Sequence, residues 1–423
     1  MFTCKALIPL GFAALAALSP AAAQTLTFRF NDTEEKELRA ALDRFEQANP
    51  GIKVTLQRTS WRDARDQFLR EAAVGQGPDV AHIAFVWAKE LGKAGATRPL
   101  DDLMTKAPLA RGLDDFVAND LVKAEGKVWG VPWTADTWAM VYRTDLLAQA
   151  GIAKPPETWD ELKAASAAVK AKTGKTGFGM PAGSASSGAM WFLANYYWWS
   201  NGKEVVTPKG DGYGLGLGRE DIAEAMAYYQ SFFKEGHAPT SLLAASDAHD
   251  PAILQALMTG NQAIAAMPTN TYKRLLADWR TANPDKPVPF ASGVTPKGSV
   301  TRLTHLGGRT LAVNANTKQP EAAWKLVQYL ASEPVFTQFY VNQFPAQTSL
   351  LKQIKFDPAE EGFAKQLAEH TRSWGAYAEG PAAMGSMWNA TTRAFGSALS
   401  GQKTPDVAAS ELHAEFGRLL GAK

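Results

Sequence analysis

The sequence predicts an α/β protein built from two lobes that are joined by a hinge and enclose a ligand cleft. In its first part, strand-like segments alternate with amphipathic helical segments, a pattern typical of parallel sheets covered by helices. Two strand-like segments then follow each other within 126–145 without a helix between them, as expected where a chain leaves one sheet and enters another. With 423 residues, the chain is long enough to bury two cores.

The first lobe is predicted from a regular alternation of elements. A strand at 26–30 precedes a helix in which Leu38, Leu42 and Phe45 fall on one face. The elements that follow are a strand, a helix, a strand and a helix, at 52–56, 62–74, 79–83 and 87–93. This alternation predicts parallel strand pairing, and in parallel sheets the loops after the carboxyl ends of the strands bind ligands.

Those loops contain four candidate ligand residues, namely Asp32, Trp61, Asp63 and Trp87. We expect Trp61 and Asp63 to be exposed, because they directly follow a strand. Asp32 is equally suited to the N-terminus of the next helix, where the helix dipole stabilises a carboxylate. Trp87 could equally belong to the core.

The crossing between the lobes is expected at 133–137, within the segment that breaks the alternation. It carries an acid, Asp136, between two tryptophans, Trp133 and Trp138. A carboxylate can accept hydrogen bonds from sugar hydroxyls, and aromatic rings pack against the apolar face of a pyranose. The alternatives are an Asp136 that only braces the hinge and tryptophans that belong to the core. Because side chains alternate along a strand, we expect at least one of the two tryptophans to be core.

The second lobe offers further candidates before and after an apolar helical stretch at 190–199. Ser184 and Ser186 precede that stretch, where they could bind ligand oxygens or simply cap the helix. The tryptophans inside the stretch are expected to pack in the core. A strand at 260–267 is followed by Asn270, which we expect to point toward the cleft.

The chain is expected to return to the first lobe near 288–313 and to cross between the lobes again at 344–349. Gly307 and Gly308 mark a place where the backbone must approach another group closely, and Arg309 follows them. In the last helical region, Trp374 and Trp388 are available to the cleft. The predicted lobes are therefore discontinuous and comprise 24–132 with 289–342, and 133–288 with 343–423.

Residues 1–23 are expected to be a cleavable secretory signal peptide, with Lys5 before an apolar run and small residues at 21–23. The only cysteine, Cys4, lies within it, so the mature chain would contain none. The formal net charge of +2 argues against nucleic acid as a partner. We expect a soluble, monomeric periplasmic protein without a cofactor.

Two other functions are alternatives to carbohydrate binding. A glycosidase needs two carboxylates across the scissile bond, and Asp136 has no clear second acid. A ferric-ion or other non-sugar binding protein of the same fold could use adjacent tyrosines, which occur at 196–197 and 228–229. No histidine or carboxylate motif supports a metal site, and neither a Gly-x-Ser-x-Gly motif nor a mature cysteine supports a catalytic nucleophile. We therefore expect no enzymatic activity.

Several short motifs together resemble the extracellular solute-binding proteins of family 1, the carbohydrate-binding proteins of ABC transporters related to maltose-binding protein. The motifs are Gly-Pro-Asp-Val at 77–80, Trp-Gly-Val-Pro at 129–132, Val-Tyr-Arg-Thr-Asp at 141–145, Pro-Glu-Thr-Trp-Asp-Glu at 156–161, the glycine pair at 307–308 and Glu-Ala-Ala-Trp-Lys-Leu at 321–326. The resemblance implies a type II-like periplasmic-binding-protein fold that closes on a carbohydrate and delivers it to a membrane permease.

The resemblance also assigns site residues. Asp136 matches the acid of the family's hinge that binds sugar hydroxyls, and Trp388 matches an aromatic platform near the C-terminus. Asn270, Val86 and Trp87 depart from the residues of maltose-binding protein, which implies a different saccharide or a glycoside. Arg309 could bind an anionic substituent of the ligand or be paired within the protein.

Overall fold

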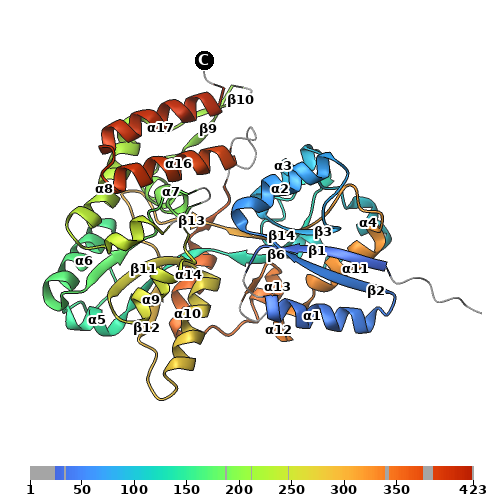
Figure 1. The fold of residues 1–423 in the computed structure, drawn as a ribbon, viewed down its shortest axis with the longest axis horizontal. Helices are drawn as coiled ribbons and strands as arrows, with labels where there is room; N and C mark the ends of the chain where they lie inside the picture. Colours follow the sequence, from blue (N-terminus) through green and yellow to red (C-terminus); the bar gives the residue numbers. More distant parts are fainter. Residues whose placement is uncertain are drawn as a thin grey trace, which may run out of the picture.

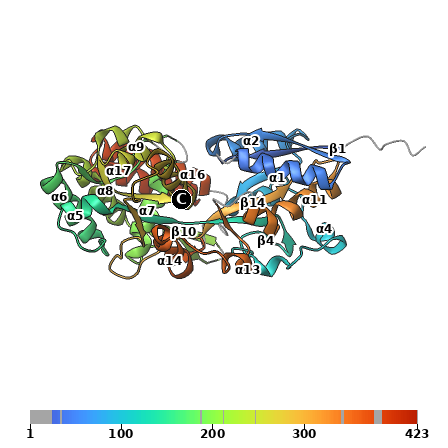
Figure 2. The same cartoon turned by 90° about the horizontal axis from the view of Figure 1, so that it is seen from below.

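The computed structural model describes residues 24–32, 35–185, 188–210, 212–245, 247–338, 343–374 and 384–421. The expected signal peptide at 1–23 and the candidate Ser186 lie outside the described residues. The protein is an α/β protein whose two lobes lie side by side, as predicted (Figures 1 and 2). No helix in the described part of the chain has the length and apolar character needed to span a membrane.

The first lobe is organised around a six-stranded sheet with the order β15-β6-β14-β3-β1-β2. As predicted, β1 pairs in parallel with both β2 and β3, whereas β14 is antiparallel to β3 and β6. The strands are β1 (Gln24–Phe30), β2 (Ile52–Arg58), β3 (Val80–Ala84), β6 (Val131–Asp136), β14 (Gly307–Val313) and β15 (Phe344–Pro345). The helices of this lobe are α1 (Glu35–Ala48), α2 (Trp61–Ala73), α3 (Ala88–Lys93), α4 (Asp101–Lys106), α11 (Pro320–Leu330), α12 (Glu333–Gln338) and α13 (Thr348–Leu351).

The second lobe has a four-stranded sheet with the order β12-β7-β11-β8. The strands are β7 (Trp138–Arg143), β8 (Thr176–Gly179), β11 (Gln262–Pro268) and β12 (Phe290–Gly293). The helices are α5 (Thr144–Gln149), α6 (Trp159–Thr173), α7 (Met190–Ser200), α8 (Arg219–Lys234), α9 (Pro251–Met258), α10 (Thr269–Ala282), α14 (Glu361–Glu369), α16 (Met384–Leu399) and α17 (Pro405–Leu419). The C-terminal α17 lies beside α8, so the end of the chain completes the half that its middle began (Figure 1).

Three short strand pairs complete the structure. They are β4 (Lys123–Ala124) with β5 (Lys127–Val128), β9 (Val206–Lys209) with β10 (Gly212–Leu215), and β13 (Thr304–His305) with β16 (Thr371–Arg372). The strands of the second pair run antiparallel. The third pair lies between the two halves of the molecule in Figure 1 and carries the chain back into β14.

Sheet membership moves the predicted lobe boundaries by a few residues. Strand β6 stays in the first sheet to its end, so the chain changes lobe at Thr137 and not at 133. Strand β12 still belongs to the second sheet, so the return follows 293 and not 288. Strand β15 pairs with β6 of the first lobe, although 343–423 was assigned to the second. Local sequence could not place these ends, because pairing with strands far away in the chain decides them.

Each lobe has its own apolar core. The alternation in β1 buries Leu26, Phe28 and Phe30 completely, and the predicted helix face of Leu38, Leu42 and Phe45 packs in the same core. The first-lobe core continues in residues 311–350, and the second-lobe core runs from β7 to α17. Since two cores are joined by a few crossing segments, the boundary between the lobes is the natural place for a ligand site.

Candidate functional site

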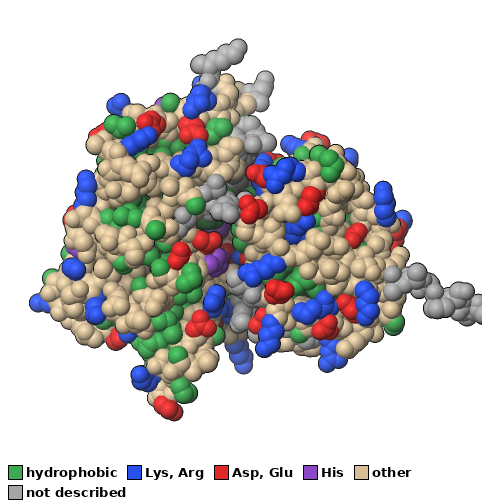
Figure 3. Space-filling view, in the orientation of Figure 1, with side chains coloured by type: hydrophobic (Ala, Val, Ile, Leu, Met, Phe, Trp, Pro, Cys, Tyr) green, Lys and Arg blue, Asp and Glu red, His purple; other side chains and the backbone are tan. Residues whose placement is uncertain are grey.

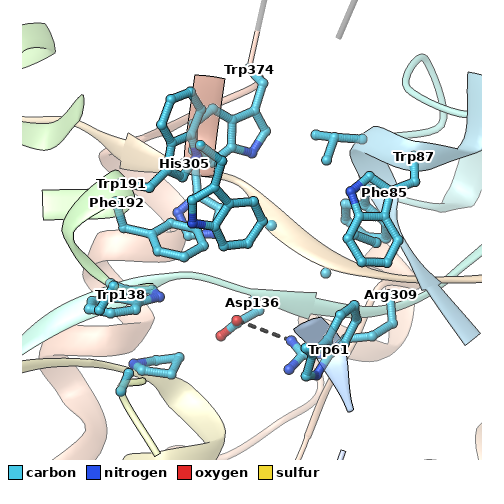
Figure 4. Close-up of a pocket in the computed structure, with 18 of the residues that line it drawn as sticks. Trp61, Phe85, Trp87, Asp136, Trp138, Trp191, Phe192, His305, Arg309 and Trp374 are labelled. Atoms are coloured by element: carbon cyan, nitrogen blue, oxygen red, sulfur yellow. Dashed lines mark ion pairs between the residues drawn. The ribbon is translucent and has the colours of Figure 1, made fainter. Parts of the chain in front are cut away.

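A cavity of about 880 Å³, counted up to its open mouth, lies between the two lobes. The face shown in Figure 3 is hollowed where the two halves of the molecule meet. The main lining residues of the cavity are Trp61, Phe85, Val86, Trp87, Asp136, Trp138, Trp191, Phe192, Asp247, His249, Pro268, His305, Gly307, Gly308, Arg309, Trp374 and Trp388 (Figure 4).

The first lobe contributes an aromatic wall from the loops at the carboxyl ends of its strands. Trp61 begins α2 just after β2, and the 3-10 turn η1 (Phe85–Trp87) follows β3 directly. The rings of Trp61 and Trp87 lie 5.6 Å apart, and both face the cavity (Figure 4). The location matches the expectation for the ligand loops of a parallel sheet.

The second lobe contributes the opposite wall. Trp138, the first residue of β7, stacks on Phe192 of α7 with the centroids 5.0 Å apart. Behind them, Trp191 stacks on Trp374 at 5.6 Å and on Trp388 at 6.3 Å. Flat aromatic faces therefore border the cavity on both sides, while Asp136 lies between them (Figure 4).

A charged cluster forms the floor of the cavity. Nη1 of Arg309 lies 3.0 Å from Oδ2 of Asp136. The other two guanidinium nitrogens donate to Asp32, Nε to Oδ2 at 2.8 Å and Nη2 to Oδ1 at 3.2 Å. Trp61 donates its indole N–H to Oδ1 of Asp32 at 2.7 Å, and the Arg309 guanidinium lies over its ring. The other carboxylate oxygen of Asp136 accepts a hydrogen bond from the Thr269 amide of the second lobe at 3.3 Å. Arg309 thus fixes one acid inside the first lobe and one at the hinge.

Burial and charge act against each other at Asp32. Burial alone would raise the pKa of this carboxyl group, but the neighbouring Arg309 cation outweighs it and holds the pKa below its usual range. The adjacent His82, whose Nε2 lies 3.7 Å from Asp32, has its pKa lowered to about 3, chiefly by burial and also by Arg309. At neutral pH Asp32 is therefore an ionised carboxylate that lies between the Arg309 guanidinium and an uncharged imidazole.

The backbone of β14 aims Arg309 into the cavity. Strand pairing between β14 and β6 shifts register between Arg309 and Thr310, because β6 has one extra residue, Trp133, between the partners of these two residues. Gly308, just before it, has φ of 150°, and a Cβ atom there would lie 2.0 Å from the Thr134 carbonyl oxygen and 2.4 Å from the Phe85 ring. The close approach predicted for the glycine pair is confirmed at Gly308.

Replacing Gly308 with alanine is expected to lower the free energy of unfolding by about 1–3 kcal/mol, because backbone strain and overpacking act together. Denaturant unfolding measures the change. Gly401→Ala is the matched control, since Gly401 has a φ of 77° but open space around it. A Gly308 variant that costs no more than the Gly401 variant would contradict the steric explanation.

The structure brings nine of the predicted site residues together in the cavity: Trp61, Trp87, Asp136, Trp138, Gly307, Gly308, Arg309, Trp374 and Trp388. Their contact with a ligand remains a prediction. Five other candidates in the described part of the chain do not line the cavity. Four of them lie elsewhere in the two lobes, and the fifth, Asp32, supports the site from behind.

Trp133 is completely buried in the first-lobe core, where its N–H donates to the Leu330 carbonyl, so of the two crossing tryptophans Trp138 alone faces the cavity. Asp63 lies in the first turn of α2 beside its cap Ser60. Ser184 is exposed next to Gly396. Asn270 lies in the first turn of α10 and lines a smaller neighbouring cavity of about 210 Å³.

Asp32 was expected either at a helix N-terminus or at the ligand. It is 3% exposed and lies behind the cavity wall, bound to Arg309. Arg309 was expected either to bind an anionic substituent of the ligand or to be paired within the protein. The structure contains the second arrangement, with Asp32 and Asp136 as partners.

Sequence reasoning missed several cavity residues, chiefly Phe192, Asp247 and His305. Phe192 lies in the stretch whose tryptophans were expected to pack in the core, and Trp191, Trp198 and Trp199 are indeed buried, although Trp191 also borders the cavity. Because all faces of this helix are apolar, its periodicity could not show which face borders the cleft. His305 precedes the glycine pair by two residues, and that proximity was the available signal.

The fold and the cavity together define a two-lobe ligand-binding protein. The chain matches the model of the bacterial extracellular solute-binding protein family over residues 31–335, and it belongs to this family.

Three similar proteins illustrate the relationship. A probable ABC transporter-binding protein of Deinococcus radiodurans is 26% identical, with 96% of each chain covered. A maltodextrin-binding protein of Bacillus subtilis is also 26% identical, over 78% of this chain and 75% of that protein. Among solved structures, the GacH receptor of Streptomyces glaucescens, studied unliganded and with acarbose, superposes with a TM-score of 0.79 at 23% identity, covering 95% of this chain and 99% of that one.

Proposed function

We propose that this chain is the substrate-binding component of an ABC importer and that it binds an uncharged saccharide or glycoside in the interlobe cavity. The observation that carries the proposal is the cavity itself, in which the carboxylate of Asp136 lies between aromatic walls from both lobes. Aromatic faces cover the C–H surfaces of a sugar ring, and a carboxylate accepts its hydroxyl hydrogens. The maltodextrin-binding and ABC transporter-binding relatives support the same assignment.

The charges of the site favour an uncharged ligand. Among the described cavity residues, Arg309 is the only lysine or arginine, and it is already paired with the carboxylates of Asp32 and Asp136. Asp247, exposed at the cavity, adds another negative charge. An anionic substituent would therefore meet the two cavity carboxylates, Asp136 and Asp247, and a guanidinium that is already paired with two acids, and like charges in a partly desolvated site repel strongly.

In this proposal the protein is exported by its N-terminal signal peptide, works in the periplasm as a monomer and catalyses no reaction on its ligand. Ligand contacts from both lobes favour the closed arrangement, and a membrane permease recognises that state.

The alternative of a ferric-ion site loses its sequence support here. The Tyr196 and Tyr197 hydroxyls bond to His305 and Glu224, those of Tyr228 and Tyr229 to backbone carbonyls, and burial raises all four pKa values, which opposes the phenolate that iron requires.

A thermal-shift screen of the purified mature protein tests the proposal. The panel contains neutral mono-, di- and trisaccharides, polyols and glycosides, each neutral sugar paired with a phosphorylated or sulfonated derivative. A specific ligand at a hundredfold excess over its dissociation constant should stabilise the protein by about 2.7 kcal/mol, and the anionic partner should give a clearly smaller shift.

Three outcomes would contradict the proposal. If no member of the panel raises the melting temperature of a folded protein, the ligand is a non-sugar solute, and ferric iron is the first addition to try. A larger shift with the anionic derivative would overturn the charge argument. Release of reducing ends from a bound glycoside would show a glycosidase instead.

A further inference from the structure

We infer that His305 is a ligand-binding residue that donates a hydrogen bond from Nε2–H to a saccharide oxygen, and that Tyr196 fixes the tautomer required for this contact. The inference rests on the proposed function and adds a polar contact that the sequence did not indicate. His305 lines the cavity and is 4% exposed.

The imidazole ring is held firmly in place. It lies parallel to the Tyr196 ring, with an interplanar angle of 9° and centroids 5.9 Å apart, and it also contacts Phe192 at 4.9 Å and Trp374 at 5.1 Å. Its backbone is fixed as well, since β13 pairs with β16 and the Thr137 hydroxyl donates to the His305 carbonyl at 3.1 Å. A ring fixed on this many sides presents the same edge to the cavity whether or not a ligand is bound.

The hydrogen bond to Tyr196 decides which nitrogen carries the proton. The Tyr196 hydroxyl and Nδ1 of His305 are 2.6 Å apart, and no other partner of this hydroxyl exists among the described residues. If Nδ1 carried the hydrogen, the tyrosine hydroxyl hydrogen would be buried without an acceptor, which costs more than the bond gains. Tyr196 therefore donates to Nδ1, and the hydrogen of the neutral ring lies on Nε2.

The opposite edge of the ring is available to a ligand. Nε2 has no hydrogen-bond partner in the described part of the chain, and it lies beside Gly307, where a Cβ atom would come within 2.4 Å of it. Burial, assisted by the Arg309 charge, lowers the pKa of His305 to about 3, so the ring is an uncharged donor at neutral pH. Asp136 accepts hydrogen bonds and His305 donates one, so the pair fits an uncharged ligand whose hydroxyls do both.

Three variants test the contact. His305→Phe keeps a stacked ring but removes the donor, and it should lower saccharide affinity by about tenfold. His305→Gln restores an N–H at comparable reach and should recover part of the loss. Tyr196→Phe leaves the imidazole but frees its tautomer, and the affinity should fall by a smaller factor, because part of the population then lacks the Nε2 hydrogen.

The tautomer itself is read by two-bond ¹H–¹⁵N correlation spectra of the histidine side chains. The sequence has six histidines, and the signals lost in His305→Phe assign those of His305. The wild-type protein should show the Nε2–H form without ligand, and Tyr196→Phe should show a mixture. Tyr229→Phe is the matched control, since it removes an equally buried hydroxyl that donates to the Leu193 carbonyl and lies outside the cavity lining, so tautomer and affinity should both be unchanged.

The outcomes separate this inference from the proposed function. A wild-type protein that binds a saccharide, together with undiminished affinity in His305→Phe, would overturn the inference alone. An Nδ1–H tautomer in the wild-type spectrum would overturn it without any ligand. If the spectrum shows the Nε2–H tautomer but the protein binds no saccharide, the proposed function is refuted, and the ligand contact with it.

Discussion

Replacing Arg309 with methionine is expected to lower the free energy of unfolding by about 3–5 kcal/mol at neutral pH. Methionine keeps much of the apolar volume, but Asp32 then loses the cation that binds both of its oxygens. Asp32 has a side chain that is 1% exposed, so water cannot replace the lost partner. Breaking a buried ion pair from one side leaves an uncompensated charge, and that charge accounts for the size of the effect.

The pH dependence of the free energy of unfolding tests the charge explanation most directly. Burial by itself raises the pKa of Asp32, and Arg309 brings it below the usual range in the wild-type protein. The stability from the ion pair is therefore fully present above the unfolded-state pKa of about 3.9 and is lost as the pH falls through the lower folded value. In the variant burial acts without the cation, the folded pKa lies above about 3.9, and stability is lost as the pH rises through that interval.

The difference between wild type and variant should therefore be largest near neutral pH and shrink as the pH falls below about 3.9 toward the lower folded-state pKa of Asp32. Urea unfolding at a series of pH values measures it. Arg143→Met is the matched control, because Arg143 is equally buried but its acid partner Asp145 is 41% exposed and stays hydrated. A difference for Arg309→Met that does not grow with pH more than the control would contradict the charge explanation. The double variant Asp32→Asn with Arg309→Met should recover part of the loss.

Replacing Asp136 with asparagine is expected to lower saccharide affinity by roughly 10- to 100-fold, with a smaller effect on stability. Hydrogen bonds to a charged group contribute about 1.5–3 kcal/mol, and asparagine removes the charge while keeping the shape. The fold should tolerate the change, because Arg309 retains both bonds to Asp32 and the asparagine oxygen can still accept from the Thr269 amide.

Isothermal titration with the saccharide found in the screen measures the affinity, and denaturant unfolding without ligand measures the stability. Asp145→Asn removes a carboxylate that binds Arg143 and lies outside the cavity lining, so its affinity should equal that of the wild type. Unchanged saccharide affinity in Asp136→Asn would remove Asp136 from the site. A stability loss as large as that of Arg309→Met would show that the acid braces the hinge.

The sequence supported the fold more completely than the site. Alternation of strands and helices predicted the parallel arrangement of β1, β2 and β3, and two consecutive strands marked the crossing between β6 and β7. Both signals are local, since strand and helix periodicity depends on neighbouring residues. The lobe ends were shifted where a short strand, such as β15, is defined by a distant partner.

At the site, local reasoning found the residues with a strong individual signal and missed those defined by their neighbours in space. Asp136 and Trp138 stood out because an acid and aromatic residues crowd one crossing, and both line the cavity. Trp133 carried the same signal but lies in the core, because all six residues of β6 are buried and alternation does not separate its faces. Residue type alone could not distinguish a tryptophan in the core from one at the cavity.

By itself, the sequence determined two α/β lobes, a crossing within 133–137 and a set of aromatic and acidic candidates, because each depends on the order of residues within one segment. The tertiary structure alone decided that Arg309 neutralises Asp32, 277 residues away, and that Tyr196 meets His305 across 109 residues. Those pairs fix the charge and the hydrogen-bonding character of the cavity. Coulomb forces and hydrogen bonds depend on distance in space, and only the folded chain sets that distance.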